Sequence, residues 1–144
     1  LKILPYTFSH RFIENNYTNY NSYVGSSLNP NSDKLSVDAK YYLNNRLDFR
    51  IGFNLIRHGK NIEDNDGNVI KNVGGDINLG HRSVDSEESK FLDGDLEKSF
   101  IISAGAKYEV FNDIYLQLDY SHSSIKNRST TKQNLINFII SINY

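Results

Sequence analysis

The last eleven residues, 134–144, alternate between apolar and other side chains in a way that strongly constrains the fold. Every second residue of this segment is a large apolar one: Ile136, Phe138, Ile140, Ile142 and Tyr144. A period of two indicates a β-strand, because successive side chains of a strand point to opposite faces. A strand of about 9 to 11 residues is also the unit that crosses a lipid bilayer at a tilt. The segment is therefore predicted to be a strand, either of a membrane barrel or of a soluble β-sandwich.

Further segments show the same period of two. The segments with apolar residues at alternate positions are 4–12, 35–43, 47–55, 100–110 and 114–122. Their other face carries charges of both signs, and the mid-strand charges are Asp38, Lys40, Asp48, Arg50, Lys107, Glu109 and Asp119. Long side chains at diagonal positions of neighbouring strands are close enough to interact, so Lys40 and Asp48 are expected to form an ion pair. The polar face is either a solvated face or the lining of a barrel interior.

The predicted connections fall into two classes by length. Keeping the apolar residues of neighbouring strands on one face requires three-residue turns at 44–46 and 111–113. The other connections are long and polar, at 14–33, 59–98 and 123–133. Within 59–98 we expect a hairpin tip around Asp66 and Gly67, and a short hairpin of 69–73 against 76–79. Short turns at one end and long loops at the other are typical of outer-membrane barrels.

The predicted fold is all-β, an antiparallel up-and-down transmembrane β-barrel. A barrel needs about eight strands to close, so we expect these six to be the C-terminal portion of a barrel. Residues 1–144 are then a single domain, expected to be part of a longer chain.

Composition excludes several classes of function. The net charge of -1 provides no electrostatic surface for nucleic acid. Cysteine is absent, which excludes disulfides, thiolate nucleophiles and thiolate metal sites. We expect no catalytic residue, because the chain has no Gly-x-Ser-x-Gly motif. We also expect no metal ion or other cofactor, because the segment Asp64–Gly67 lacks the earlier aspartate of a calcium loop, position 62 being Ile.

Two stretches resemble the carboxyl-terminal part of the Wzi-type capsule assembly family. The first is a tyrosine-containing loop, 17–20, followed by 24–35, which contains Asn29-Pro30-Asn31-Ser32. The second is Arg57-His58-Gly59. The chain has Asn29 where the family pattern leads us to expect glycine. The resemblance implies an integral outer-membrane barrel that acts as a surface lectin and helps to retain capsular or other exported polysaccharide. The expected partners are outer-membrane lipid, surface polysaccharide and other envelope proteins, with the C-terminus in the periplasm.

The candidate ligand-binding residues lie within the two longer polar segments or directly before the second one. They are Tyr17, Asn19, Tyr20, Tyr23, Arg57, His58 and Arg82. Sugars are recognised by aromatic faces beside amide and charged hydrogen-bonding groups, and these segments contain both. The alternative is an ordered loop that packs its own tyrosine rings. Other functions also remain open: a channel or transporter barrel, or a barrel subunit of a larger envelope complex, and secondly a soluble all-β binding domain.

Overall fold

The computed structural model describes residues 1–7, 18–19, 22–23, 27–86 and 88–142, and it is all-β. The strands are β1 (Lys2–Ile3), β2 (Thr18–Asn19), β3 (Ser22–Tyr23), β4 (Ser32–Asn44), β5 (Leu47–Lys60), β6 (Ile62–Glu63), β7 (Val69–Lys71), β8 (Asp95–Phe111), β9 (Ile114–Lys126) and β10 (Thr130–Ile142). Six of them form one antiparallel sheet in the order β1-β4-β5-β8-β9-β10, and β2-β3 and β6-β7 form two small hairpins. No helix in the described residues is long and apolar enough to span a membrane.

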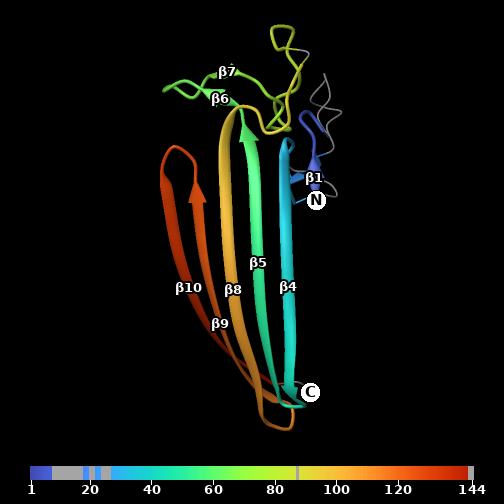
Figure 1. Cartoon of the computed structure of the whole chain (residues 1–144), viewed down its shortest axis with the longest axis vertical. Helices are drawn as coiled ribbons and strands as arrows, with labels where there is room; N and C mark the ends of the chain where they lie inside the picture. The colour runs from blue at the N-terminus through green and yellow to red at the C-terminus, as the bar shows by residue number, and fades with distance from the viewer. Residues whose placement is uncertain (8–17, 20–21, 24–26, 87, 143–144) are drawn as a thin grey trace. The chain divides into compact units, whose positions relative to one another are not determined.

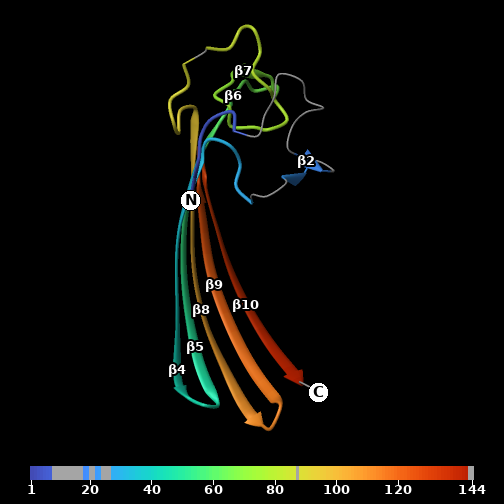
Figure 2. The ribbon, with the colours of Figure 1, turned by 90° about the vertical axis from the view of Figure 1, so that its right-hand side faces the viewer.

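The chain divides into two compact units, and three of the long strands contribute residues to both. Unit 1 comprises Leu1–Lys34 and Ile56–Lys98, and unit 2 comprises Leu35–Leu55 and Ser99–Tyr144. Within unit 2 the long strands lie side by side in a single layer (Figures 1 and 2).

The long strands of unit 2 confirm the predicted β-periodicity. Strands β9 and β10 pair in antiparallel register, with Ile114 opposite Ile142 and Tyr120 opposite Ile136. This register places their apolar residues on one face of the sheet, as the alternation predicts. Between β4 and β5, the hydroxyl of Ser36 donates to the Asn54 side chain at 2.7 Å, which agrees with the register that the sequence predicts.

The two tight turns of unit 2 are each one residue shorter than predicted. Strand β4 ends at Asn44 and β5 begins at Leu47, while β8 ends at Phe111 and β9 begins at Ile114. The reason is local: the first residue of the predicted 44–46 turn still belongs to its strand, and its side chain closes the turn. Asn44 Oδ1 accepts hydrogen bonds from the backbone N–H groups of Arg46 (2.8 Å) and Leu47 (2.9 Å).

The predicted loop at 123–133 is wrong. Strand β9 continues to Lys126 and β10 begins at Thr130, so only three residues connect them. The backbone N–H of Asn127 donates to the carbonyl oxygen of Ser129 at 2.9 Å across this turn. Polar composition suggested a loop, but serine, threonine and glutamine also occupy strands whose backbone groups are satisfied by a neighbour. The predicted difference in loop length between the two ends of the strands therefore depends on two long connections, 14–33 and 59–98, and no longer on three.

The amino-terminal prediction is also wrong where it can be compared. Leu4–Thr7 of the predicted strand 4–12 form a turn in which Tyr6 has φ 56°, and residues 8–12 lie outside the described part. The strand before this turn is the two-residue β1, where Lys2 pairs with Asp33 and Ile3 with Ser32 of β4. Pro5 lacks the N–H that a continued ladder needs, which favours a turn at this point.

Unit 1 is built around loops that are joined by hydrogen bonds. The predicted hairpin tip at Asp66 and Gly67 is confirmed, with Gly67 at φ 85° between β6 and β7. The predicted hairpin of 69–73 against 76–79 is wrong, because Val69 and Lys71 pair with β6 instead. The carboxylate of Asp64 favours this pairing, since it accepts hydrogen bonds from the backbone N–H groups of Asp66 (2.9 Å) and Asn68 (2.8 Å) and holds the tip closed.

The sheet has two open edges in the described part of the chain. β10 has β9 as its only neighbour, and the far edge of β4 is paired only with β1. No pairing among the described residues joins β10 to β4. The observed architecture is therefore a six-stranded antiparallel sheet.

Candidate functional site

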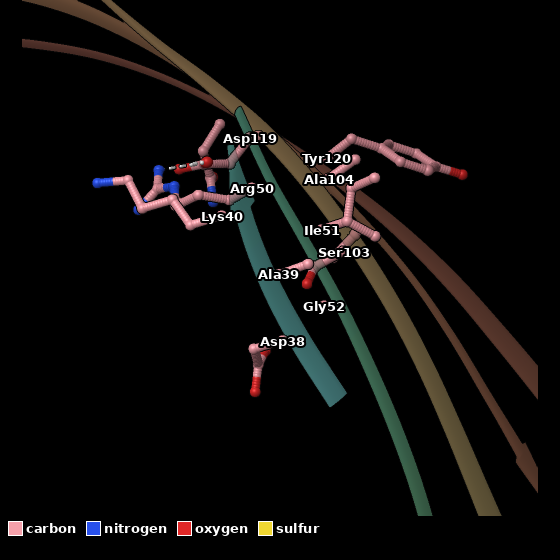
Figure 3. Close-up of a pocket in the computed structure, with 13 residues that line it drawn as sticks. Asp38, Ala39, Lys40, Arg50, Ile51, Gly52, Ser103, Ala104, Asp119 and Tyr120 are labelled. Atoms are coloured by element: carbon pink, nitrogen blue, oxygen red, sulfur yellow. Dashed lines mark hydrogen bonds and ion pairs between the residues drawn. The ribbon is translucent and has the colours of Figure 1, made fainter. Parts of the chain in front are cut away.

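The polar face of unit 2 carries a row of paired charges. Lys40 Nζ lies 3.5 Å from Asp48 Oδ2, which confirms the predicted diagonal ion pair. Arg50 Nη2 donates to Asp119 Oδ1 at 3.0 Å, from β5 to β9 across β8 (Figure 3). The four side chains are between 15% and 43% exposed, so these pairs remain in contact with solvent.

Two glycines allow this arrangement. A Cβ atom on Gly105 of β8 would collide with Asp119 Oδ1, and a Cβ on Gly52 of β5 would lie 2.9 Å from Asp38 Oδ1. Both carboxylates therefore rest against backbone where any other residue would place a side chain. The result is a hollow of about 460 Å³, the polar hollow, whose polar lining comes from Asp38, Lys40, Arg50, Ser103, Asp119, Ser121 and Asn137.

Of the two carboxylates of the polar hollow, Asp38 is the one available to bind a ligand. Within the described part of the chain it has no hydrogen-bond or ion-pair partner, whereas Asp119 accepts bonds from Arg50 and Gln117. Figure 3 places Asp38, Lys40, Arg50 and Asp119 on one side of the strands and Tyr120 on the other. Adjacent carboxylate, guanidinium, ammonium, hydroxyl and amide groups can donate and accept hydrogen bonds over a short distance. This chemistry suits a ligand rich in hydroxyl groups.

The opposite face of unit 2 is apolar and uncovered. Fourteen of its large side chains are between 39% and 69% exposed: Leu35, Val37, Tyr41, Leu43, Phe49, Ile51, Ile102, Tyr108, Leu118, Tyr120, Ile136, Phe138, Ile140 and Ile142. This face has a shallow depression of about 420 Å³ lined mainly by apolar side chains, among them Phe49, Ile51 and Leu118. Among the described residues, every buried hydrophobic side chain belongs to unit 1.

Four of the candidate binding residues lie in the segment 17–23, and the structure describes two of them. Tyr17 and Tyr20 lie outside the described residues. Asn19 lies in β2 and Tyr23 in β3, and the backbone pairs are Thr18 with Tyr23 and Asn19 with Ser22. These two residues are thus brought into one small hairpin.

The other three candidates lie in unit 1 and contact neighbouring groups of that unit. The Arg57 guanidinium donates two hydrogen bonds to the carboxylate of Asp33, one of them 2.9 Å long from Nε. His58 is 9% exposed, and its Nε2 donates to the carbonyl oxygen of Gly75 at 2.8 Å. These interactions give Arg57 and His58 a role in joining segments of unit 1, and their role in ligand binding stays a prediction.

Arg82 makes the most extensive of these contacts. Its guanidinium donates to Asp85 Oδ1 from Nη2 (2.7 Å) and Nε (3.0 Å), and from Nη1 to the carbonyl oxygen of Val69 at 3.2 Å. The Asp85 side chain is only 2% exposed. Burial alone would raise the pKa of Asp85, but hydrogen bonds from Arg82 and Asn72 and the charge of Arg82 outweigh it and hold the pKa below its ordinary value.

No group of three His, Asp or Glu side chains that could bind a metal ion occurs in the described part of the chain.

The polar hollow was not evident from the sequence. The polar hollow depends on which strands are neighbours, because Arg50 and Asp119 are 69 residues apart in the sequence. The available signal was a glycine inside a strand pattern, at Gly52 and Gly105, which marks close approach of another group.

Comparison of the chain with family models, with curated proteins and with solved structures finds no match.

Proposed function

We propose that this chain forms part of the wall of an outer-membrane β-barrel, with the apolar face of unit 2 against lipid and the polar face toward an aqueous interior. The observation that carries the proposal is the exposure of the apolar face, where Ile136 is 69% and Phe138 63% exposed. Soluble monomers rarely expose contiguous apolar patches larger than a few hundred Å². Strands that alternate between lipid and a polar interior have this appearance.

The lengths of the strands support the same proposal. The strands with residues in unit 2 run from 13 residues in β4 to 17 in β8, which exceeds the roughly 9 to 11 residues needed to cross a bilayer. Their mid-strand charges lie on the polar face only, where Lys40 pairs with Asp48 and Arg50 with Asp119. Charges on the lipid face would be costly, and this distribution avoids them. The open edges at β4 and β10 require further strands to close a barrel.

We also propose that the barrel associates with a surface polysaccharide, which binds in the polar hollow. The free carboxylate of Asp38 and the nearby hydroxyl and amide groups support this, because they match the hydrogen-bonding groups of a sugar. Three of the candidate residues contribute by holding unit 1 together: Arg57 and His58 of β5, and Arg82.

Single-cysteine scanning of β10 tests the membrane proposal. The chain has no cysteine, so each variant from residue 134 to 142 carries one nitroxide label at a known position. In vesicles, accessibility to oxygen should peak at Ile136, Phe138 and Ile140, and accessibility to a water-soluble nickel chelate at Asn137 and Ser141. Oxygen and nickel accessibility that do not alternate would refute the proposal.

Calorimetric titration with exported polysaccharide tests the binding proposal separately. Asp38→Asn should weaken binding about tenfold if the carboxylate accepts a charge-assisted hydrogen bond from the sugar. Gln133→Ala is the control, since Gln133 is exposed on β10 but does not line the polar hollow. Equal affinity of both variants, or ion conductance in planar bilayers without any sugar binding, would favour a channel instead.

A further inference from the structure

The outer edge of β4 is paired for only a short distance. At one end of the strand, Lys2 and Ile3 of β1 lie opposite Asp33 and Ser32. Leu1 continues this ladder, because the N–H of Lys34 donates to the Leu1 carbonyl oxygen at 2.8 Å and the Leu1 nitrogen donates to the Lys34 carbonyl oxygen at 2.9 Å. Beyond Lys34, β5 is the only strand beside β4 in the described part of the chain.

The pairing of Lys34 determines which backbone groups of β4 face the open edge. In an antiparallel ladder, a residue that bonds one neighbour through both its N–H and its C=O is followed by a residue that bonds the other neighbour. Since Lys34 bonds β1, the N–H and C=O groups of Ser36, Asp38, Lys40 and Tyr42 point to the open edge. An edge of this length is a template for a further strand, and in hydrocarbon unpaired groups are costly.

We propose that an extended polypeptide strand, antiparallel to β4 and running directly into β1, occupies the edge from Leu35 to Asn44. The existing β1 ladder sets its direction and its register, because the residue numbers of each pair sum to 35. The strand carries apolar side chains opposite Leu35, Val37 and Leu43, which are 54% to 56% exposed. It carries a lysine or arginine beside Asp38, the carboxylate that has no partner among the described residues; this cation pairs with one carboxylate oxygen and leaves the other to a ligand in the polar hollow.

A second copy of this chain does not fit this edge. Successive long strands alternate in direction, so β4 and β10 run the same way (Figure 1). Pairing β10 of one copy with β4 of another would therefore be parallel, which does not continue an up-and-down sheet. Pairing β4 with β4 is antiparallel, but it would invert one copy across the membrane. The inference rests on the proposed function only for this orientation argument and for the cost of unpaired groups in lipid.

Two amino-terminal extensions of the chain, studied in detergent micelles, test the proposal. The matched extension adds ten residues before Leu1, with apolar residues at odd positions counted back from Leu1 and arginine at the fourth position, which faces Asp38. The shifted extension lacks the residue next to Leu1, so every side chain turns to the opposite face. With the matched extension, the amides of Asp38 and Lys40 should exchange about 100-fold more slowly than in the unextended chain. The shifted extension should leave their exchange unchanged.

A disulfide provides the second measurement. Ser36→Cys, combined with cysteine at the second position of the matched extension, should oxidise to a single intramolecular bond, since the chain has no other cysteine. Unchanged exchange together with no disulfide would overturn the proposal, and equal protection by both extensions would overturn the register. A nitroxide at Phe138 separates this result from the proposed function: lipid contact with an unprotected β4 edge refutes only the strand, and an aqueous Phe138 with a protected edge refutes only the membrane wall.

Discussion

The two units of the chain are stabilised in opposite ways. Unit 1 buries polar side chains together with a few apolar ones: Asn31, His58, Asn61 and Asn72 are at most 9% exposed, as are Leu28, Val73 and Ile77. Unit 2 leaves many large apolar side chains exposed, and Phe138 and Ile140 are 63% and 64% accessible. The buried polar side chains of unit 1 are hydrogen-bonded, whereas unit 2 exposes an apolar face whose contact with water is unfavourable.

Under the proposed function, each unit is suited to a different solvent: unit 1 to water and the apolar face of unit 2 to lipid. Asn61 illustrates unit 1: its Oδ1 accepts hydrogen bonds from the backbone N–H groups of Val73 (2.9 Å) and Gly75 (3.3 Å), so a side chain replaces the regular ladder of a sheet. In unit 2 the ladder satisfies the backbone, and the side chains are left to face their surroundings.

Asn31→Ala should have the largest effect, and it should be confined to unit 1. Asn31 is fully buried with φ 56°; its Nδ2 donates to the carbonyl oxygens of Gly59 (2.8 Å) and Asp93 (3.1 Å), and its Oδ1 accepts from Leu92 N–H at 2.7 Å. Losing these bonds and placing alanine at positive φ should cost about 4 kcal/mol. Hydrogen exchange should show faster exchange of the Leu92 amide, with β9 and β10 unaffected.

Asn31→Gly is the matched control for this prediction. Glycine removes the same hydrogen bonds but accepts a positive φ, so it should be about 1 kcal/mol less destabilising than alanine. Equal loss of protection in unit 1 and in β9–β10 would show that the units are not separately stabilised.

The sequence predicts the fold of unit 2 better than that of unit 1, because the two units are stabilised in different ways. A period of two identifies β4, β5, β8, β9 and β10 because a ladder imposes it on every strand with one apolar face. The period fails where a strand is polar on both faces, as in Thr130–Gln133, which were expected to be a loop. It also fails in unit 1, where side-chain to backbone bonds such as those of Asn31 join residues about 60 positions apart and leave no periodic signal.

Ile51→Arg should have the next largest effect, and this effect should depend on the solvent. Ile51 is 62% exposed on the apolar face. In a bilayer, arginine near the middle of that face should lower the free energy of unfolding by about 3 kcal/mol. Asn137→Arg, on the polar face of β10, should cost less than about 1 kcal/mol. Urea unfolding in lipid vesicles measures both, and equal costs would mean that the two faces meet the same environment.

The candidate site was less predictable than the fold. The diagonal pair Lys40–Asp48 follows from strand parity and from one hairpin, so the sequence is sufficient for it. The contact between Arg50 and Asp119 requires knowing that β5 and β9 both lie beside β8, and hairpin periodicity contains no information about that. For Arg57, His58 and Arg82, residue type indicated binding, while their observed partners are other groups of unit 1.

Acid should destabilise unit 1 through Asp85. A carboxyl group whose pKa is lowered by folding stabilises the folded state above its unfolded value of about 3.9, and this stabilisation is lost as the pH falls through the lower folded value. At pH 7, Asp85→Asn should therefore cost about 2 kcal/mol, since the Arg82 bonds are lost from a side chain that is 2% exposed. The difference between variant and parent should shrink as the pH falls below about 4, as measured by exchange of unit 1 amides. If the difference does not depend on pH, the charge of Asp85 does not contribute to the stability of unit 1.

The smallest predicted effect concerns Gly105, the floor of the polar hollow. Gly105→Ala should change the free energy of unfolding by less than about 1 kcal/mol, because the better strand propensity of alanine offsets the displacement of Asp119. It should nevertheless abolish the coupling between Arg50 and Asp119.

A double-mutant cycle of Arg50→Gln and Asp119→Asn measures this coupling. The coupling energy should be about 0.5 kcal/mol in the parent, as is usual for an ion pair whose side chains are 42% and 30% exposed, and near zero in the Gly105→Ala background. The cycle of Lys40→Gln and Asp48→Asn is the internal control, since that pair does not involve Gly105. If the Arg50–Asp119 coupling survives alanine at 105, the carboxylate has room elsewhere and the polar hollow does not depend on glycine.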